Sequence, residues 1–212
     1  MKKILIATPC LYGKVDAYYV HSLCESIKLG FKHSLAINAI FLAEESILTI
    51  ARNELINLAY RDEYDSMVFI DDDELWAPDA LIEILLSKKD VVAIPVVNKG
   101  DARVEYNVSY DKNKTQKDED GYIKVRSVGT GFLKLSRKAI VDLCESNSEI
   151  IFRNKKLKNV FEFNYMNGAF IGEDIMLCRK LHELGYGIWI NPKHTVSHMG
   201  VKMYKGDFQK NI

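Results

Sequence analysis

Short apolar segments alternate with amphipathic segments along the first hundred residues, and this alternation limits the fold more than any other feature. The expected strands are 3–8, 34–42, 66–70 and 90–97, and the expected helices between them are 15–29, 44–60 and 78–87. Pro9 and Gly30 are expected to end the first strand and the first helix. Strands separated by helices pair in parallel, with helices covering both faces of the sheet. We therefore predict an α/β fold with a mostly parallel, Rossmann-like central sheet flanked by helices.

The second hundred residues follow a different pattern. Strands are expected at 104–110, 122–128, 132–135 and 186–190, helices at 136–144 and 173–184, and an exposed polar loop at 111–121. Short strands without long helices between them predict a small antiparallel extension of the sheet. A chain of this length suits one domain, so 1–212 is interpreted as a single domain whose character changes near residue 100.

The composition excludes several classes of protein. The net charge is zero and the pI is near 7.0, so a broad basic surface for nucleic acid is not expected. No apolar run approaches the roughly 20 residues that a membrane-spanning helix needs. Four cysteines occur without a Cys-x-x-Cys pair: Cys10, Cys24, Cys144 and Cys178. The absence of such a pair argues against a structural zinc site and a disulfide scaffold, and it favours a reducing cytoplasm. Cys24, Cys144 and Cys178 lie in helical patterns among apolar residues and are interpreted as inert.

Three consecutive aspartates follow the expected strand 66–70. Ligand sites in parallel sheets lie at the carboxyl ends of strands, which is where Asp71, Asp72 and Asp73 stand. Carboxylates spaced one residue apart can hold Mg²⁺ or Mn²⁺, which usually complete their shells with water and phosphates. The alternative is an acidic turn that only caps the helix beginning near Pro78.

Other candidate residues lie far from these aspartates in the sequence. Glu173 and Asp174 begin a helix, where acids are stabilised by the helix dipole, and either could also act as a general base. His198 follows the last expected strand and is either a metal ligand or a structural hydrogen-bonding residue. Arg52 lies within a helix and could bind a phosphate or be a solvated helix residue. Gly129-Thr130-Gly131 forms a flexible bend, but no Gly-Lys-Ser/Thr follows to make a P-loop.

The order of these motifs is more specific than any one of them. They are Thr8-Pro9-Cys10 with Tyr12-Gly13, Ala51-Arg52-Asn53, Phe69 to Asp73, Asp90-Val91-Val92, Gly129 to Phe132, Gly172-Glu173-Asp174, His198-Met199-Gly200 and Tyr204 to Asp207. The set resembles the nucleotide-sugar-dependent glycosyltransferases of the GT-A fold, especially the small single-domain type of bacteriophage and bacterial genomes. The resemblance covers nearly the whole chain.

The resemblance implies a nucleotide-binding half at 1–100 and an acceptor-binding half at 101–212. In the first half, Thr8, Pro9 and Tyr12 would border the base and ribose, and Arg52 and Asn53 would contact the nucleotide. Asp71, with Asp72 beside it, would approach the ribose or a metal-bound water.

The resemblance also implies a metal centre and a catalytic base. Asp73 and His198 would ligate Mn²⁺ or Mg²⁺, with Asp71 adjoining them. Asp174, with Glu173 beside it, would be the base of an inverting hexosyl- or pentosyltransferase, and Gly129, Thr130, Gly131 and Glu173 would line the sugar and acceptor pocket. The favoured donor is a UDP-sugar.

The acceptor is the least determined part of this interpretation. The resemblance favours a hydroxymethylated pyrimidine in phage DNA, in a host cytoplasm. Lys99, Arg103, 153–158 and 202–210 would then meet phosphates unless they are only solvated faces. A cell-surface glycan or its lipid-linked precursor is the alternative. The oligomeric state stays open.

Three rival functions are weighed against glycosyl transfer. A nucleotidylyltransferase would need a glycine-rich signature after the first strand, where Thr8-Pro9-Cys10 stands. A haloacid-dehalogenase-type phosphatase would carry its Asp-x-Asp close to the first strand, not after the third. A non-catalytic nucleotide-sugar-binding module would not need Glu173, Asp174 and His198 in addition to the aspartates.

Overall fold

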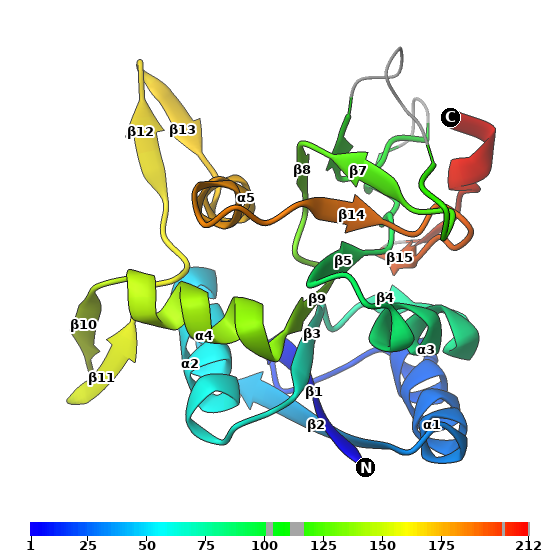
Figure 1. Cartoon of the computed structure of the whole chain (residues 1–212), viewed down its shortest axis with the longest axis horizontal. Coiled ribbons are helices and arrows are strands. Elements are labelled where there is room, and N and C mark those ends of the chain that lie inside the picture. The colour runs from blue at the N-terminus through cyan, green and yellow to red at the C-terminus, as the bar shows by residue number, and fades with distance from the viewer. Residues whose placement is uncertain (101–103, 111–116, 201, 212) are drawn as a thin grey trace.

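A seven-stranded mixed sheet forms the centre of the computed structural model, which describes residues 1–100, 104–110, 117–200 and 202–211 (Figure 1). Its strands, in the order in which they lie side by side, are β2 (Leu35–Ala43), β1 (Lys2–Cys10), β3 (Ser66–Ile70), β9 (Phe132–Ser136), β5 (Val91–Ala93), β14 (Ile188–Ile190) and β7 (Ile123–Val125). Three neighbouring pairs are parallel: β2–β1, β1–β3 and β5–β14. The other three pairs are antiparallel.

The strands therefore do not all run in one direction. β9 opposes both β3 and β5, and β7 opposes β14, whereas the remaining five strands share one direction. The α/β class is confirmed, and the sheet is compatible with a Rossmann-like fold without being specific to it. Because β9 lies between two strands of the first half, the two predicted halves share one sheet.

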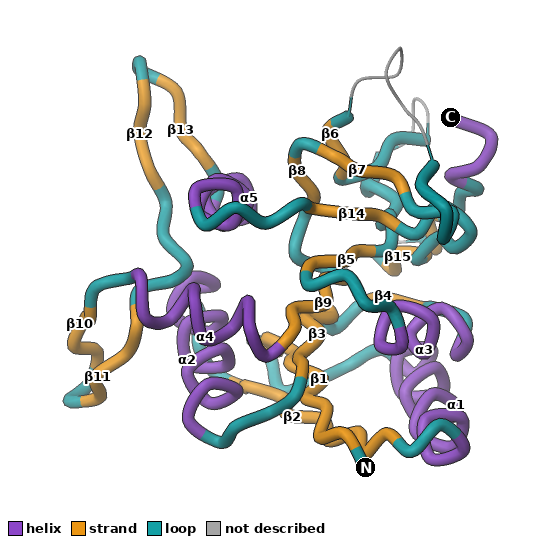
Figure 2. Tube along the Cα trace, viewed as in Figure 1, coloured by secondary structure: helices purple, strands orange, loops and turns teal. Residues whose placement is uncertain are grey.

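Helices cover both faces of this sheet, as Figures 1 and 2 show. The helices are α1 (Ala17–Lys32), α2 (Leu48–Arg61), α3 (Pro78–Leu86), α4 (Arg137–Ser146) and α5 (Glu173–Glu183). One core cluster joins α2, α4 and α5 to one face of the sheet. A second cluster joins α1 and α3 to the other face. None of the helices in the described ranges is long and apolar enough to cross a bilayer.

Small elements surround the sheet. They are the hairpins β10 (Glu149–Phe152) with β11 (Lys155–Lys158) and β12 (Asn164–Met166) with β13 (Ala169–Ile171), the three-stranded set β16 (Met203–Tyr204), β15 (Ser197–Met199) and β4 (Glu74–Leu75), the pair β6 (Val108–Ser109) and β8 (Ser127–Val128), and a 3₁₀ turn η2 (Phe208–Asn211). Both hairpins project from one side of the molecule (Figure 2). The β15–β4 pairing brings His198 opposite Glu74 and so next to the aspartates.

The predicted ends of the first strand and the first helix are both wrong, for identifiable reasons. Pro9 does not end β1, which continues to Cys10 beside β2. On the other side, β3 pairs with β1 only as far as Ala7. The N–H that Pro9 lacks is therefore not needed for pairing with β3. Gly30 does not end α1, which continues to Lys32. A Cβ at Gly30 would lie 2.6 Å from Ile37 Cδ1, so this glycine lets α1 pack closely on β2.

Other predicted elements are confirmed or are shorter than expected. The strand 66–70 is confirmed, as is the Ser136 cap, whose hydroxyl accepts from Ala139 N. The expected strand 90–97 is reduced to β5, and its buried continuation forms only isolated bridges, such as Val96 with Val196. The expected strand 104–110 is reduced to β6. Of the predicted loop 111–121, residues 111–116 lie outside the described residues.

The cysteines are free thiols in three different settings. Cys144 and Cys178 are buried, and burial raises the pKa of each to about 12, which fits inert core residues. Burial, followed by the charge on Asp72, also raises the pKa of Cys10. Cys24 lies in a helix as expected, but in contrast to the other three it is exposed on α1.

Candidate functional site

A pocket of about 350 Å³ opens where β1 and β3 end, and most of the predicted nucleotide and metal residues line it. Its walls include Pro9, Arg52, Asp71, Asp72, Asp73, Lys99 and His198. These residues come from a strand, a helix and three loops or strand ends spread over the whole chain. The fold thus places the ordered motifs of the sequence around one opening.

Asp73 binds two cationic or potentially cationic partners. Its Oδ1 lies 3.0 Å from His198 Nε2, and its Oδ2 lies 2.5 Å from Lys99 Nζ. Burial alone would raise the pKa of Asp73, but the hydrogen bonds and charges of His198 and Lys99 outweigh it and lower the pKa. Asp73 is therefore a carboxylate at neutral pH, as a metal ligand must be.

The orientation of His198 is decided by its second ring nitrogen. Nδ1 lies 3.1 Å from the carbonyl oxygen of Val97, a contact in which Nδ1 donates its proton. In the neutral ring this leaves Nε2 as an acceptor that faces another acceptor, Asp73 Oδ1. Only a cation between them, either a proton or a metal ion, makes this contact favourable. Fixing one histidine nitrogen on a carbonyl is also how proteins orient metal-ligating imidazoles.

The spacing of this pair fits an octahedral ion. Two adjacent ligand atoms that each lie about 2.1 Å from such an ion are about 3.0 Å apart. Asp73 Oδ1 and His198 Nε2 are separated by 3.0 Å. The same separation is an ordinary hydrogen-bond length, so these two side chains fit either a shared proton or an Mn²⁺ or Mg²⁺ ion with further positions left for water and phosphate oxygens.

Asp71 does not join this pair. Its Oδ1 accepts a hydrogen bond of 3.1 Å from Arg52 Nη2, and Nη1 of the same guanidinium binds Glu173 Oε1. Arg52 is buried and bridges the aspartate run to the start of α5. Asp71 is thus a partner of Arg52 in the pocket wall, and its place beside a ribose or a metal stays a prediction.

Beneath Asp71 lies a group of buried polar atoms without hydrogen-bond partners. They are Glu74 Oε1 and Oε2, Arg52 Nε and Thr130 Oγ1. Burial and then the charges of Asp71 and Asp73 raise the pKa of Glu74 well above its ordinary value, although Arg52 opposes this. Buried polar atoms are rarely left unpaired. Glu74 thus adds a buried carboxyl with a raised pKa beside Asp71 and Asp73.

Gly131 is required by these acids. A Cβ at Gly131 would collide with Glu74 Oε1 and would lie 3.2 Å from Asp71 Oδ2. Its carbonyl accepts from Asp71 N at 3.0 Å. Gly129 and Thr130 are buried too, and a Cβ at Gly129 would collide with the Asn107 side chain. Gly131 thus supports the aspartate run, and the lining of a sugar and acceptor pocket by Gly129, Thr130 and Gly131 stays a prediction.

Asp72 differs from Asp73 in the direction of its pKa shift, and Asp174 differs from Glu173 in its hydrogen-bond partner. Burial, then the charges of Asp73 and Asp71, raise the pKa of Asp72, which lines the pocket. Asp174 Oδ1 accepts from Ile175 N at 2.7 Å, so one of its oxygens caps its own helix. Glu173, not Asp174, is the acid that Arg52 connects to the aspartate run.

Two predicted nucleotide contacts are corrected. Thr8 is fully buried, and its hydroxyl lies 2.5 Å from the hydroxyl of Tyr19 in α1. Asn53 is also fully buried: its amide donates to the Phe161 carbonyl and accepts from Phe161 N, both at 2.8 Å. Both side chains therefore serve the core. Pro9 does line the pocket, while Tyr12 is exposed and outside its lining.

A second carboxylate and histidine cluster lies elsewhere. Asp79, Glu83 and His194 place ligand atoms within 4.8 Å of one another, so this group could bind a metal ion. Glu83 Oε2 lies 2.9 Å from His194 Nε2, and Oε1 lies 2.5 Å from Lys193 Nζ. Asp79 is exposed on α3. The sequence analysis did not single out these residues.

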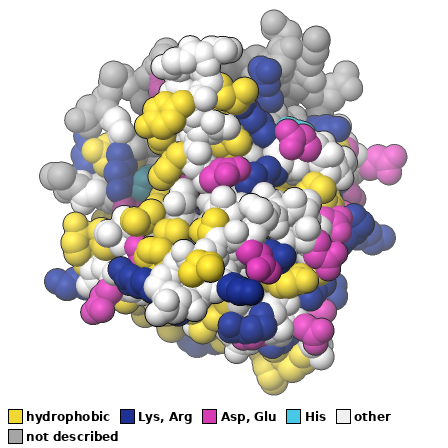
Figure 3. Space-filling model, turned by 90° about the vertical axis from the view of Figure 1, so that its left-hand side faces the viewer, with side chains coloured by type: hydrophobic (Ala, Val, Ile, Leu, Met, Phe, Trp, Pro, Cys, Tyr) yellow, Lys and Arg dark blue, Asp and Glu magenta, His cyan; other side chains and the backbone are white. Residues whose placement is uncertain are grey.

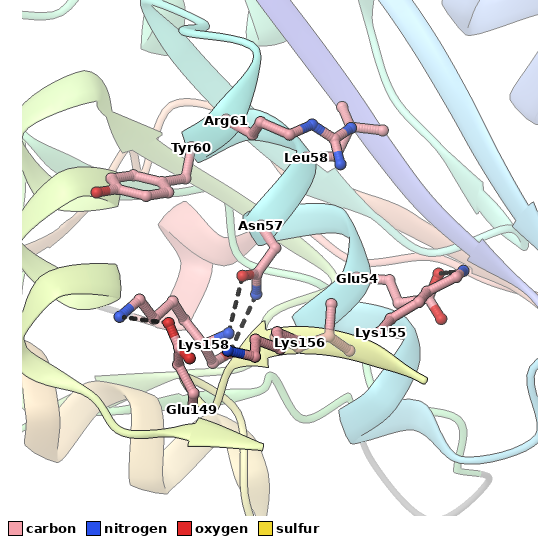
Figure 4. A pocket seen from close by; sticks show the side chains of 10 residues that line it. Glu54, Asn57, Leu58, Tyr60, Arg61, Glu149, Lys155, Lys156 and Lys158 are labelled. Atoms are coloured by element: carbon pink, nitrogen blue, oxygen red, sulfur yellow. Dashed lines mark hydrogen bonds and ion pairs between the residues drawn. The ribbon is translucent and has the colours of Figure 1, made fainter. Parts of the chain in front are cut away.

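Another hollow of about 430 Å³ lies between α2 and the β10–β11 hairpin (Figure 4). Its charges are matched within the chain: Glu54 pairs with Lys155 at 3.0 Å, and Glu149 pairs with Lys158 at 3.3 Å. Asn57 fixes the hairpin by bonding both the N–H and the carbonyl of Lys158. Of the predicted residues, only the basic stretch 153–158 reaches this hollow, through Lys155, Lys156 and Lys158, and the two ion pairs favour a structural role.

Sequence reasoning missed two residues of the site. Glu74 was not considered, although it extends the acidic run by one position and so had a visible signal. Lys99 was considered only as a contact for DNA phosphates, because nothing local in the sequence connects it to Asp73.

No family model matches this sequence, and no curated protein matches it.

Proposed function

We propose that this protein is a metal-dependent glycosyltransferase that uses a nucleotide-sugar donor. The observation that carries the proposal is the facing pair of Asp73 Oδ1 and His198 Nε2, 3.0 Å apart, with His198 Nδ1 held by the Val97 carbonyl. Bound there, Mn²⁺ or Mg²⁺ would neutralise charge on a departing diphosphate. The proposed GT-A fold is supported by the resemblance and by the α/β class of the sheet.

The nucleotide portion has a defined place in this proposal. Pro9 and the aspartates wall the same pocket as Arg52. Arg52 holds Asp71 by a hydrogen bond to one oxygen, which keeps its other oxygen available to a ribose hydroxyl. A UDP-sugar is the favoured donor because the resemblance favours it.

Asp174 is proposed as the base that removes the proton from the acceptor hydroxyl, in an inverting reaction. The carboxylate of Glu173 is already engaged by Arg52, so Glu173 is proposed to position the start of α5. Asp174 uses one oxygen on Ile175 N, and its second oxygen has no bond to another described residue. That oxygen can accept a proton.

The structure weakens the case for DNA as the acceptor. Four of the basic residues predicted to meet phosphates are paired with acids of the chain: Lys99 with Asp73, Arg153 with Glu45, Lys155 with Glu54, and Lys158 with Glu149. Arg103 lies outside the described residues. Binding a polyanion would require these pairs to break. A hydroxymethylated pyrimidine in DNA remains a proposal, with a glycan as the alternative that this charge pairing favours.

The proposal is tested by donor hydrolysis and by binding. The wild-type protein with Mn²⁺ should slowly hydrolyse a UDP- or GDP-sugar, and chelation should stop the reaction. His198→Ala should weaken Mn²⁺ binding by about 10- to 100-fold, measured by titration calorimetry. Metal-dependent turnover that survives in His198→Ala would refute the metal site.

The base assignment has its own experiment. Asp174→Asn should bind the donor as tightly as the wild-type protein and lose transfer to any acceptor. Glu173→Gln should lower the stability of the fold, because it removes one of the two negative charges that face the buried Arg52 guanidinium. Equal transfer rates in Asp174→Asn and the wild-type protein would remove Asp174 from the reaction.

A further inference from the structure

The β12–β13 hairpin carries three exposed aromatic rings on one face. Tyr165 lies opposite Phe170 in the strand register, and Phe163 continues the same face. The ring centroid of Phe170 lies 5.2 Å from that of Phe163 and 5.5 Å from that of Tyr165. Phe163, Tyr165 and Phe170 are 46%, 75% and 56% exposed. Figure 3 looks onto the side from which the hairpins project and shows hydrophobic side chains at the surface there.

The opposite face of the hairpin is turned toward α5. Met166 lies on that face and contacts the guanidinium of Arg179 in α5. Because alternate residues of a strand point to opposite faces, the three rings point away from α5 and into solvent. The stretch 163–172 contains no Asp, Glu, Lys or Arg. The ring face is therefore aromatic and uncharged.

The base of the hairpin is fixed to the candidate site at both of its ends. Before the hairpin, Asn53 bonds both the N–H and the carbonyl of Phe161. After the hairpin, Arg52 binds Glu173. Two consecutive residues of α2 therefore hold the chain on either side of the arm. This sets the position of the rings relative to the start of α5, where the acids stand.

The rings form a row that leads away from these acids. Phe163 directly precedes β12, whose first residue pairs with Ile171 at the end of β13, so Phe163 is the ring at the base of the hairpin. Phe170 is three residues from Glu173, or about 10 Å along an extended strand. Tyr165 lies directly across from Phe170, at the same level of the hairpin. A chain-like ligand whose end reached the acids could lay its next units on the row.

We propose that this aromatic face binds a neutral saccharide chain, the acceptor of the proposed glycosyl transfer, on which this inference rests. The electron-rich faces of aromatic rings attract the C–H faces of sugar rings, and this contact needs no charge. A single-stranded nucleic acid also stacks on aromatic rings, but its phosphates need cations beside them. An anionic membrane needs the same. The uncharged face separates the saccharide from both.

The experiment compares Tyr165→Ala/Phe170→Ala with Phe31→Ala, which removes an equally exposed ring from α1. The probes are a microarray of neutral glycans, a 20-mer of oligothymidylate, and vesicles of phosphatidylcholine with phosphatidylglycerol. The best glycan should shift the aromatic NMR signals of the hairpin. Its affinity should fall about 10-fold or more in the double variant and stay unchanged in Phe31→Ala. Tyr165→Phe, which keeps the ring, should bind as the wild-type protein does.

Folding is controlled by thermal denaturation, in which the double variant should match the wild-type protein because both rings are exposed. The proposal is overturned if no neutral glycan binds, or if the best glycan binds the double variant equally well. Ring-dependent binding of the oligonucleotide or the vesicles, or ring-dependent self-association in ultracentrifugation, would also overturn it. Titration of the wild-type protein with UDP and Mn²⁺ tests the proposed function separately. Glycan binding without Mn²⁺-dependent nucleotide binding would retain the ring surface and refute the transferase.

Discussion

Two clusters in this molecule have nearly the same composition. In one, Asp73 lies 3.0 Å from His198 and 2.5 Å from Lys99. In the other, Glu83 lies 2.9 Å from His194 and 2.5 Å from Lys193. Each is a carboxylate between an imidazole and an ammonium group. The nearby Asp79 even gives the second cluster one more possible ligand.

The surroundings of the two clusters differ. Asp73 stands at the end of β3, beside a buried arginine and close to the unpaired polar atoms of Glu74 and Thr130. Glu83 stands on α3, and Asn191 completes its hydrogen bonds at 3.2 Å. The two acids are about equally exposed, 31% for Asp73 and 35% for Glu83. The two clusters therefore differ in the buried polar groups around them, and not in the residue types they contain or in exposure.

The largest effect is expected from Arg52→Met. Removing the guanidinium leaves Asp71 and Glu173 as unpaired, partly buried carboxylates, which should cost about 3–5 kcal/mol of unfolding free energy. Urea denaturation measures the loss. The control is Arg61→Met on the same helix, whose side chain is 72% exposed and which should cost no more than about 0.5 kcal/mol. Equal costs in the two variants would show that the bridge does not hold the first cluster together.

Asp73→Ala should have the next largest effect, on metal binding. Loss of a direct ligand should weaken Mn²⁺ binding about 100-fold, or about 2.7 kcal/mol. Calorimetry and the electron paramagnetic resonance signal of free Mn²⁺ measure it. If Glu83→Gln weakens Mn²⁺ binding by the same factor and Asp73→Ala does not, the metal ion binds at the second cluster and not at the first.

Lys99→Met, unlike Asp73→Ala, should tighten Mn²⁺ binding at the first cluster. The Lys99 ammonium occupies Asp73 Oδ2, so it competes with a metal ion in the absence of nucleotide. Its removal should tighten Mn²⁺ binding by about tenfold, or about 1.4 kcal/mol. Lys193→Met, next to Glu83, is the matched control and should leave Mn²⁺ affinity unchanged. Weaker Mn²⁺ binding in Lys99→Met would mean that Lys99 supports the metal site.

The smallest effect is expected from Glu83→Gln. Although burial alone would raise the pKa of Glu83, Lys193, His194 and Asn191 lower it from its ordinary value of 4.5. A lowered carboxyl pKa stabilises the fold above the ordinary value, and this contribution disappears as the pH falls through the folded-state pKa. Because Glu83 is one-third exposed, the substitution should cost only about 0.5 kcal/mol at pH 7 and nothing in strong acid. Denaturation at several pH values checks this, and a constant difference would contradict it.

Much of the fold could be predicted because its signals are local. The strand 66–70 has its expected limits, and the Ser136 cap forms as its hydroxyl dictates. Gly30 was misinterpreted because its reason lies in another element, where Ile37 of β2 leaves no room for a Cβ. The reversed direction of β9 had no signal in the sequence, since an apolar strand reads the same in either orientation.

The candidate site could be predicted as a set of residue types but not as a set of contacts. Pro9, Arg52, the three aspartates and His198 do surround one pocket. Thr8 and Asn53 do not, although they are as close in the sequence to pocket residues as any other candidate. Whether a side chain faces the pocket or the core depends on the direction in which its element is packed. For Asn53, that direction is toward Phe161.

Local periodicity and helix chemistry suffice to predict the α/β class, the strand ending on the aspartates and the acids at the start of α5. Which charges meet depends on the tertiary structure. Asp73 and His198 are 125 residues apart, and Arg52 and Glu173 are 121 residues apart. It also placed an uncharged row of aromatic rings beside those acids. Charge and packing act through space, and the distance between two side chains is set by the whole fold.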